Sequence, residues 1–198
     1  MNWTCLNRFV EIKSPWLTLI GEKWQDDQQA ILEYWRVEKA DSLIILPIQK
    51  ANVDLSPSSQ DRFLLPRSFY RPGLGMTTLD FPGGRLLPEQ QPETLIPQIL
   101  QQELGISPNQ IIELSVINAQ GWAVNSSFSN QKLYGYVAYL SPNLIVESPL
   151  LGASYAVSRT AIAELLTQLH CLQCRALLLE WCYINALTEI LNRLTPDS

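Results

Sequence analysis

The carboxylates that could support chemistry gather in the segment 81–106, FPGGRLLPEQQPETLIPQILQQELGI. Its acids are Glu89, Glu93 and Glu103, and carboxylates are the ligands through which proteins hold Mg²⁺. Apolar residues recur here at steps of three and four, which predicts a helix at 93–104. Side chains at those steps share one helix face, so carboxylates in such an array could converge on a cation. Most other polar side chains of the segment are glutamine, which has nearly the size of glutamate but no charge.

The segment resembles the signature of the Nudix hydrolases, in particular of their ADP-ribose pyrophosphatase-like branch. That signature is Gly, five residues, Glu, seven residues, then Arg-Glu-aliphatic-any-Glu-Glu-any-Gly-aliphatic. Gly84 and Gly105 match its glycines, and Glu103 matches its last acid. The resemblance extends over residues 8–194, through FLLPRSFYRPGLGMTTLDFPGGRL before the helix and YAVSRTAIAELL near the C-terminus. Other positions differ, with Gln90, Ile99 and Gln102 at glutamate positions and Gln98 at the arginine position.

The resemblance implies that an active member holds Mg²⁺ on several carboxylates of this helix and directs water at a diphosphate. Here Glu103 alone remains of that set. Mg²⁺ gives up its water reluctantly, so a single carboxylate is a poor site for it. Glu89 and Glu93 are the other candidate catalytic acids, although neither lies on the face of Glu103. Pro97 falls inside the expected helix, where proline costs about 3 kcal/mol, so we expect a kink or a restart there.

Two arginines and a glycine are candidate ligand-binding residues. Arg71, in YRPG, and Arg85, directly after Gly84, can bind phosphates or a ribose-linked group through paired hydrogen bonds. Each can equally pair with an acid such as Asp80 or Glu89, because the same fork of donors does both. The sequence leaves these two interpretations open.

The loop 119–131 is where the resemblance implies substrate-facing residues and a catalytic acid, yet it contains no acid. Trp122, in this loop, is a candidate for stacking on an adenine, but packing is the commoner role of such an aromatic and we favour it. Glu147 is interpreted as a solvated surface charge. His170 is the one histidine of the chain, and we interpret it as structural.

The segment HCLQC places His170, Cys171 and Cys174 close together. A structural zinc site usually takes its four ligands from two such clusters. Cys5 and Cys182 do not form a second pair. We therefore interpret HCLQC as a helix start with buried thiols rather than as a zinc or redox site.

The remaining elements follow from residue patterns. β-Branched and aromatic residues predict strands, and DSLIILPIQ is dense enough to be buried on both faces. Ser158 is a suitable N-cap for the first of two C-terminal helices, and Gly105 a suitable C-cap for the central one. The expected strands are RFVEIK, WLTLIGEKW, AILEYWRVE, DSLIILPIQ, RFLLPRSF, TTLDF, IIELSVINA and KLYGYVAYL.

This order of strands and helices predicts an α/β fold in which helices cover both faces of a mixed sheet. The resemblance makes it a Nudix α/β/α sandwich at 41–198 with an N-terminal antiparallel β extension at 1–40. Members of that branch commonly form dimers through the extension, which implies a homodimer here.

Composition excludes several classes of protein. The net charge is −5 and lysine and arginine form no run, which disfavours nucleic-acid binding. No apolar stretch reaches the roughly 18 residues of a membrane helix, and the first residues do not form a secretory signal. A cytoplasmic location without a membrane partner is therefore expected. Charged residues make up 17%, against about 25% in average soluble domains, which fits a surface partly covered by a partner.

Three functions stay open on the sequence alone. The first is a catalytically degenerate Nudix-fold protein that binds a nucleotide-like ligand or a protein without cleaving it, and that needs no cofactor. The second is a weak nucleoside diphosphate-X hydrolase that uses Mg²⁺ on Glu103 together with Glu89 or Glu93. The third is a scaffold subunit of a larger complex.

Overall fold

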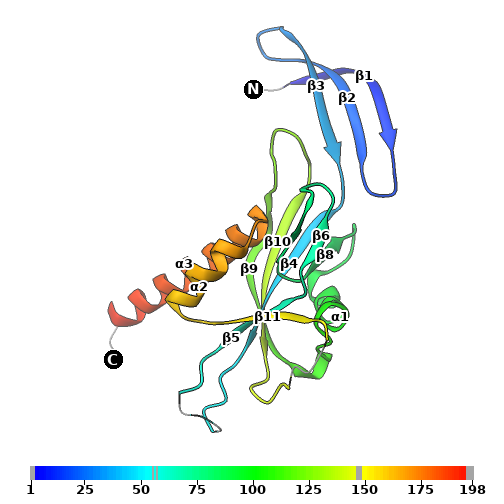
Figure 1. Ribbon diagram of the computed structural model, residues 1–198. Helices are drawn as coiled ribbons and strands as arrows, with labels where there is room; N and C mark the ends of the chain where they lie inside the picture. The colour runs from blue at the N-terminus through cyan, green and yellow to red at the C-terminus, as the bar shows by residue number, and fades with distance from the viewer. Residues whose placement is uncertain (1–2, 55, 57, 146–148, 195–198) are drawn as a thin grey trace.

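The structure begins with a separate three-stranded antiparallel sheet. The computed structural model in Figure 1 describes residues 3–54, 56, 58–145 and 149–194, of which 187–194 are described by their backbone alone. Glu147 lies outside the described residues. The strands, in the spatial order β1–β2–β3, are β1 (Thr4–Lys13), β2 (Thr18–Gln25) and β3 (Ile31–Glu38). We call them the N-terminal sheet, which projects beyond the rest of the chain in Figure 1 as the expected antiparallel extension.

A buried carboxylate organises the N-terminal sheet. Glu22 is 2% exposed and accepts hydrogen bonds from Arg36 Nε at 2.9 Å, Arg36 Nη2 at 3.1 Å, Trp24 Nε1 at 3.1 Å and Arg8 Nε at 3.2 Å. The hydrogen bonds from Arg36, together with those from Trp24 and Arg8, lower the pKa of Glu22 to about 2 despite its burial. The hydrogen bonds of Glu22, on β2, therefore connect all three strands of this sheet, to Arg8 on β1 and to Arg36 on β3.

The N-terminal sheet leaves large apolar side chains in contact with solvent. A two-layer domain would bury such residues against a second layer, but the described part of the chain covers only some of them. The exposed members are Trp3, Leu6, Phe9, Ile12, Trp16, Leu17, Ile31, Leu32 and Trp35.

The main body is built on a six-stranded mixed sheet. The central strand β4 (Asp41–Gln49) runs parallel to β10 (Lys132–Leu140), and the other pairs are antiparallel. The spatial order is β11–β5–β4–β10–β9, with β8 paired to the first half of β4 beside β5. The further strands are β5 (Arg62–Pro66), β8 (Gly83–Leu86), β9 (Ile111–Ala123) and β11 (Leu151–Ala156).

Strand β4 is buried on both faces, as its apolar density predicts. Leu43 and Ile45 pack into one hydrophobic cluster, while Ile44 and Leu46 pack into another on the opposite face. Pro47 is tolerated in this central strand because it falls between the stretch of β4 that pairs with β8 and the stretch that pairs with β5, where the ladder requires no amide from it.

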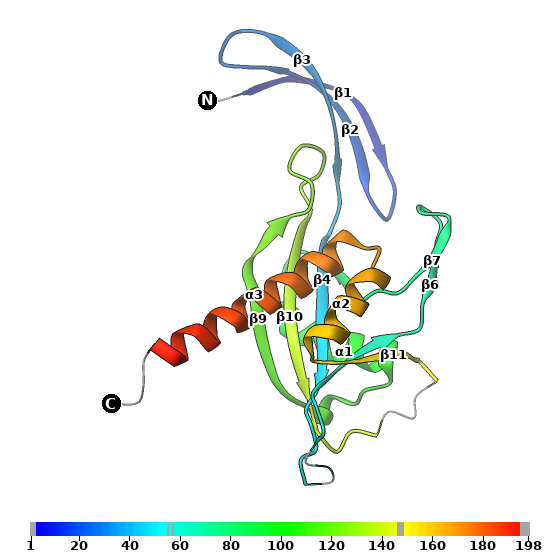
Figure 2. The same ribbon diagram turned by 60° about the vertical axis from the view of Figure 1, so that its left-hand side comes forward.

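Helices close both faces of the sheet (Figure 2). Helix α1 (Pro92–Leu104) buries Ile96 and Leu100 in the cluster of Leu43. Helices α2 (Arg159–Gln168) and α3 (Leu172–Leu194) bury Leu165 and Leu177 in the other cluster. The expected mixed sheet with helices on its two faces is therefore confirmed. The remaining elements are a hairpin of β6 (Phe69–Arg71) and β7 (Met76–Thr78), and a short 3-10 helix, η1 (Pro108–Gln110).

Helix α1 runs through Pro97 without interruption, so of the two expected outcomes a restart there does not occur. The helix begins with Pro92 at its first turn and ends at Gly105, which adopts the left-handed conformation with φ of 71°. Pro97 only removes the amide that would bond to the carbonyl of Glu93, and tertiary burial of the neighbouring Ile96 stabilises the helix nonetheless.

Three expectations about strands between 62 and 86 were wrong in detail. RFLLPRSF is split between β5 and β6, which belong to different sheets. TTLDF forms a strand only to Thr78, followed by an isolated bridge from Leu79 to Leu169. Gly83–Leu86, which the expected strands do not include, is strand β8, because β4 supplies the pairing that two glycines would not favour alone. Within the described residues, no helix combines the length and hydropathy needed to cross a membrane.

Candidate functional site

A pocket of about 830 Å³ lies where the first residues of β4, the β6–β7 hairpin, β8, α1 and the turn between α2 and α3 meet. Segments that are far apart in the sequence thus contribute to one surface. The polar and charged residues that line it are Ser42, Arg71, Thr78, Asp80, Arg85, Glu103, His170, Cys171, Gln173 and Cys174, and Gly83 and Gly84 form part of its wall.

Glu103 projects from the last turn of α1 into this pocket and accepts a hydrogen bond of 3.4 Å from the amide of Gly83. Burial raises its pKa, while the Gly83 amide and the charge of Arg71 act in the opposite direction and that of Asp80 adds to the rise. A carboxylate in this setting can accept a proton or contact a cation.

Arg71 and Asp80 form an ion pair at the edge of the pocket. Oδ2 of Asp80 accepts hydrogen bonds from Arg71 Nε at 2.9 Å, Arg71 Nη2 at 2.6 Å and Thr78 Oγ1 at 3.0 Å. Oδ1 of Asp80 is buried without a hydrogen-bond partner among the described residues. Of the two roles that the sequence left open for Arg71, the structure shows pairing with Asp80, in a side chain that remains 49% exposed toward the pocket.

Arg85 connects the pocket to the N-terminal sheet. Its Nη2 donates to the carbonyl oxygens of Pro15 at 3.2 Å and Trp16 at 3.3 Å, in the turn between β1 and β2. The guanidinium carbon lies 4.7 Å from the centroid of the Trp16 ring, a cation–π distance. Gly84 lies next to Arg85 in the pocket wall and packs on Ile99, since a β-carbon at Gly84 would come within 2.9 Å of Ile99 Cδ1.

Two of the three candidate acids lie outside the pocket lining. Glu93, at the start of α1, accepts a hydrogen bond of 2.7 Å from the hydroxyl of Tyr136. Glu89 is exposed in the turn before α1, with a left-handed φ of 70°. Neither carboxylate joins Glu103 in the pocket.

The residues that stand at the other conserved positions of the Nudix signature also lie outside the pocket lining. Ile99 is 5% exposed in the core, and Gln102 and Gln98 are exposed to solvent outside the pocket lining. Gln90 closes the turn before α1, where its Oε1 accepts from the Leu87 amide at 3.0 Å.

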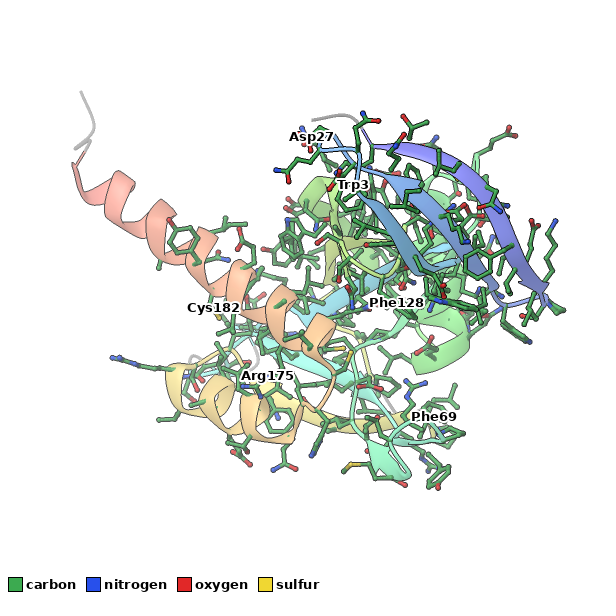
Figure 3. All side chains as sticks on the ribbon, turned by 90° about the horizontal axis from the view of Figure 1, so that it is seen from above. Trp3, Asp27, Phe69, Phe128, Arg175 and Cys182 are labelled. Atoms are coloured by element: carbon green, nitrogen blue, oxygen red, sulfur yellow. The ribbon has the colours of Figure 1, made fainter. Side chains whose placement is uncertain are left out.

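The loop between β9 and β10 faces the N-terminal sheet and not the pocket. The carbonyl oxygen of Phe128, a residue labelled in Figure 3, accepts a hydrogen bond of 2.7 Å from the Val37 amide. Asn130 Oδ1 accepts one of 3.0 Å from the Lys39 amide. Trp122, at the end of β9, packs against the hydrophobic cluster of Ile44 and does not line the pocket.

Sequence reasoning missed the contribution of the turn between α2 and α3. Cys171 stands directly before α3, and its sulfur accepts the backbone amides of Cys174 and Gln173. The hydrogen bond from the Cys174 thiol, with those amides, lowers the pKa of Cys171 to about 6, while the same bond and burial raise the pKa of Cys174. The helix start and the buried Cys174 match the expectation, but a carboxylate of Asp80 beside them could not be foreseen from spacing.

Comparison with solved structures is informative about the fold. No protein-family model matches the chain, and no curated protein does. Among solved structures, an ADP compounds hydrolase superposes with a TM-score of 0.70 at 15% sequence identity, covering 92% of this chain and 94% of that chain. The chain has a Nudix-type fold. Within this Nudix-type fold, the segment that resembles the Nudix signature borders the pocket through Gly84 and Glu103.

Proposed function

We propose that this protein binds a nucleotide-like diphosphate compound in the pocket without hydrolysing it. The solved structure that shares its fold is named for hydrolysis of ADP compounds, which suggests the class of ligand. Arg71 and Arg85 lie on the pocket wall, where guanidinium groups can contact phosphate oxygens. The ligand class is suggested by the similar structure, whereas the lack of Mg²⁺-dependent cleavage is argued from the residues of this chain.

One observation carries this proposal: the pocket is short of carboxylates. Among the described residues that line it, only Glu103 and Asp80 carry them, and one oxygen of Asp80 is already held by Arg71 and Thr78. Mg²⁺ requires near-octahedral oxygen ligands and is normally held by carboxylates together with substrate phosphates. Glu89 and Glu93 would have to leave their present positions to complete a site for catalysis.

The test combines calorimetry with product analysis. Purified protein is mixed with ADP-ribose in the presence of Mg²⁺ or Mn²⁺, and we expect heat of binding with no release of AMP. Arg71→Gln should weaken the binding by about tenfold, as expected when a charged hydrogen bond to a phosphate is lost. Release of AMP by the wild-type protein that disappears in Glu103→Gln would show that the chain is a hydrolase and would contradict the proposal.

A charge-restoring variant tests the placement of the signature. Gln90→Glu, Ile99→Glu and Gln102→Glu together return the acids of the family to their positions, and we expect cation-dependent AMP release to appear. Because Ile99 is buried, circular dichroism must show that the variant folds, and the pair Gln90→Glu with Gln102→Glu serves as a milder version. Gln101→Glu adds the same charge at an exposed position outside the acidic positions of the signature and should produce no activity.

We further propose that the N-terminal sheet associates with a second copy of the chain. Support comes from the nine large apolar side chains exposed on the N-terminal sheet and the residues next to its strands, since exposed apolar surface can mark an interface. Ile12→Lys, on β1, should raise the dimer dissociation constant at least about tenfold in analytical ultracentrifugation. Ile112→Lys, on β9, is the matched control, because the two isoleucines are 60% and 57% exposed. A monomeric wild-type protein at micromolar concentration would refute this assignment.

A further inference from the structure

Three potential metal ligands meet on one wall of the pocket. The sulfur atoms of Cys171 and Cys174 and a carboxylate oxygen of Asp80 all lie within 4.8 Å of one another. The cysteines come from the start of α3, and Asp80 comes from the segment between β7 and β8, about 90 residues earlier in the chain. The group is therefore created by the tertiary fold.

Hydrogen bonding inside the chain leaves part of this group unsatisfied. Oδ2 of Asp80 has three donors, whereas Oδ1 is buried and has none among the described residues. A buried carboxylate oxygen without a partner costs free energy, and a cation is one of the few groups that can remove the cost. The two sulfur atoms beside the Asp80 carboxylate are themselves metal ligands once they are deprotonated.

We propose that Cys171, Cys174 and Asp80 bind a thiophilic divalent cation, Zn²⁺, on the wall of the pocket. In tetrahedral coordination with Zn–S bonds of about 2.3 Å, two sulfur atoms lie about 3.8 Å apart, so small side-chain rotations bring the three ligands into place. The separation of the cysteines, with two residues between them, is a usual spacing for zinc ligands.

All three proposed ligands line the pocket, so a cation held by them would border it. Three protein ligands with one open position is the arrangement in which zinc keeps a water molecule or contacts a ligand. His170 also lines the pocket but lies outside the group of three, and its Nδ1 is 3.0 Å from the carbonyl oxygen of Gln168. An exchangeable molecule is therefore expected at this position.

Local charge is consistent with a divalent cation. Two thiolates and one carboxylate carry a charge of −3, and Zn²⁺ together with the guanidinium of Arg71 supplies +3. The amides of Gln173 and Cys174 already point at the sulfur of Cys171, which favours its thiolate form. Zinc binding displaces the remaining thiol protons, so the affinity should fall as the pH is lowered.

Cobalt titration of the full-length protein tests the site directly. Metal-free, reduced protein is titrated with Co²⁺, and we expect one equivalent to produce sulfur-to-cobalt charge-transfer bands and the visible bands of tetrahedral Co²⁺. Zn²⁺ should abolish these bands, whereas millimolar Mg²⁺ should not, because Mg²⁺ prefers oxygen ligands. Cys171→Ser and Asp80→Asn should each weaken Co²⁺ binding at least about tenfold.

Cys182→Ser is the matched control, because Cys182 lies about two turns beyond Cys174 along α3 and is not a member of the group. This variant should titrate as the wild type does. A second measurement needs no variant: Zn²⁺ should protect the half-buried Cys171, but not the exposed Cys5, from alkylation in the native protein. Absence of charge-transfer bands, equal binding by Cys171→Ser, or an unprotected Cys171 thiol would each overturn the proposal, whatever the outcome of the ADP-ribose assay.

Discussion

Replacement of Glu22 by glutamine should selectively weaken the N-terminal sheet. The amide keeps the shape of the side chain and one acceptor oxygen. It removes the negative charge of the carboxylate that accepts hydrogen bonds from Arg36, Arg8 and Trp24. Two guanidinium groups then remain without the anion between them, while the six-stranded sheet is untouched.

The magnitude follows from the pKa of Glu22. A decrease from the ordinary value of 4.5 to about 2 corresponds to about 3 kcal/mol of stabilisation at neutral pH. Arg8 and Arg36 are 39% and 24% exposed, so solvent screening reduces this, and we expect about 2 kcal/mol. Because the folded pKa lies below the unfolded one, the contribution is complete above pH 4.5 and disappears as the pH falls toward about 2.

Amide hydrogen exchange measured by mass spectrometry resolves the effect by segment. At neutral pH, Glu22→Gln should reduce protection in β2 by about thirtyfold, the equivalent of 2 kcal/mol, and leave β4 unchanged. Fluorescence offers a parallel measure, because four of the six tryptophans lie before residue 40. In an acid titration, the wild-type signal should change between pH 4.5 and about 2, and the signal of the variant should not.

Glu33→Gln provides the control, since Glu33 is exposed and accepts a single hydrogen bond, from Trp35 Nε1 at 2.9 Å. Its effect should stay within about 0.5 kcal/mol, as for most surface changes. The reasoning would be refuted if Glu22→Gln lost no more protection than this control. Equal loss in β2 and β4 would also refute it, because the N-terminal sheet would then not open separately.

Three further substitutions test the packing of the main body by denaturant unfolding. Gly135→Ala should cost about 1–3 kcal/mol, because the added methyl group overlaps the buried side chain of Leu177, whereas Gly73→Ala has free space around it and should be neutral. Pro97→Ala should stabilise the protein by about 1–3 kcal/mol by restoring a helical hydrogen bond in α1, and an unchanged midpoint would argue against this cost. Glu103→Gln should stabilise by about 1 kcal/mol at pH 7, because burial penalises the ionised carboxylate. This difference should vanish below pH 4, where the carboxyl group is neutral in both states, and its persistence at pH 3 would contradict the assignment.

Much of the fold could be predicted because its signals are local. The apolar run of β4 is long enough to specify a strand buried on both faces, and Gly105 marks the end of α1 through its left-handed conformation. Local rules failed where tertiary contacts override propensity. Strand β8 contains two glycines and exists because β4 pairs with it, and α1 continues through Pro97 because its apolar face is buried.

The candidate site was less accessible from sequence than the fold. Glu103 and Gly84 could be nominated from the signature and the two arginines from the residues around it, and all four line the pocket. The proximity of Asp80 to Cys171 could not be predicted, because the tertiary fold brings together two segments that are far apart in the sequence.

The position of Arg85 links the pocket physically to the N-terminal sheet. One guanidinium group borders the pocket and also stacks on Trp16 and bonds to the β1–β2 turn. A phosphate that reoriented this group would break its contacts with the turn, and by thermodynamic reciprocity a restraint on the turn would then change the affinity for the phosphate by the same factor. Self-association through that sheet would then make occupancy of the pocket depend on protein concentration.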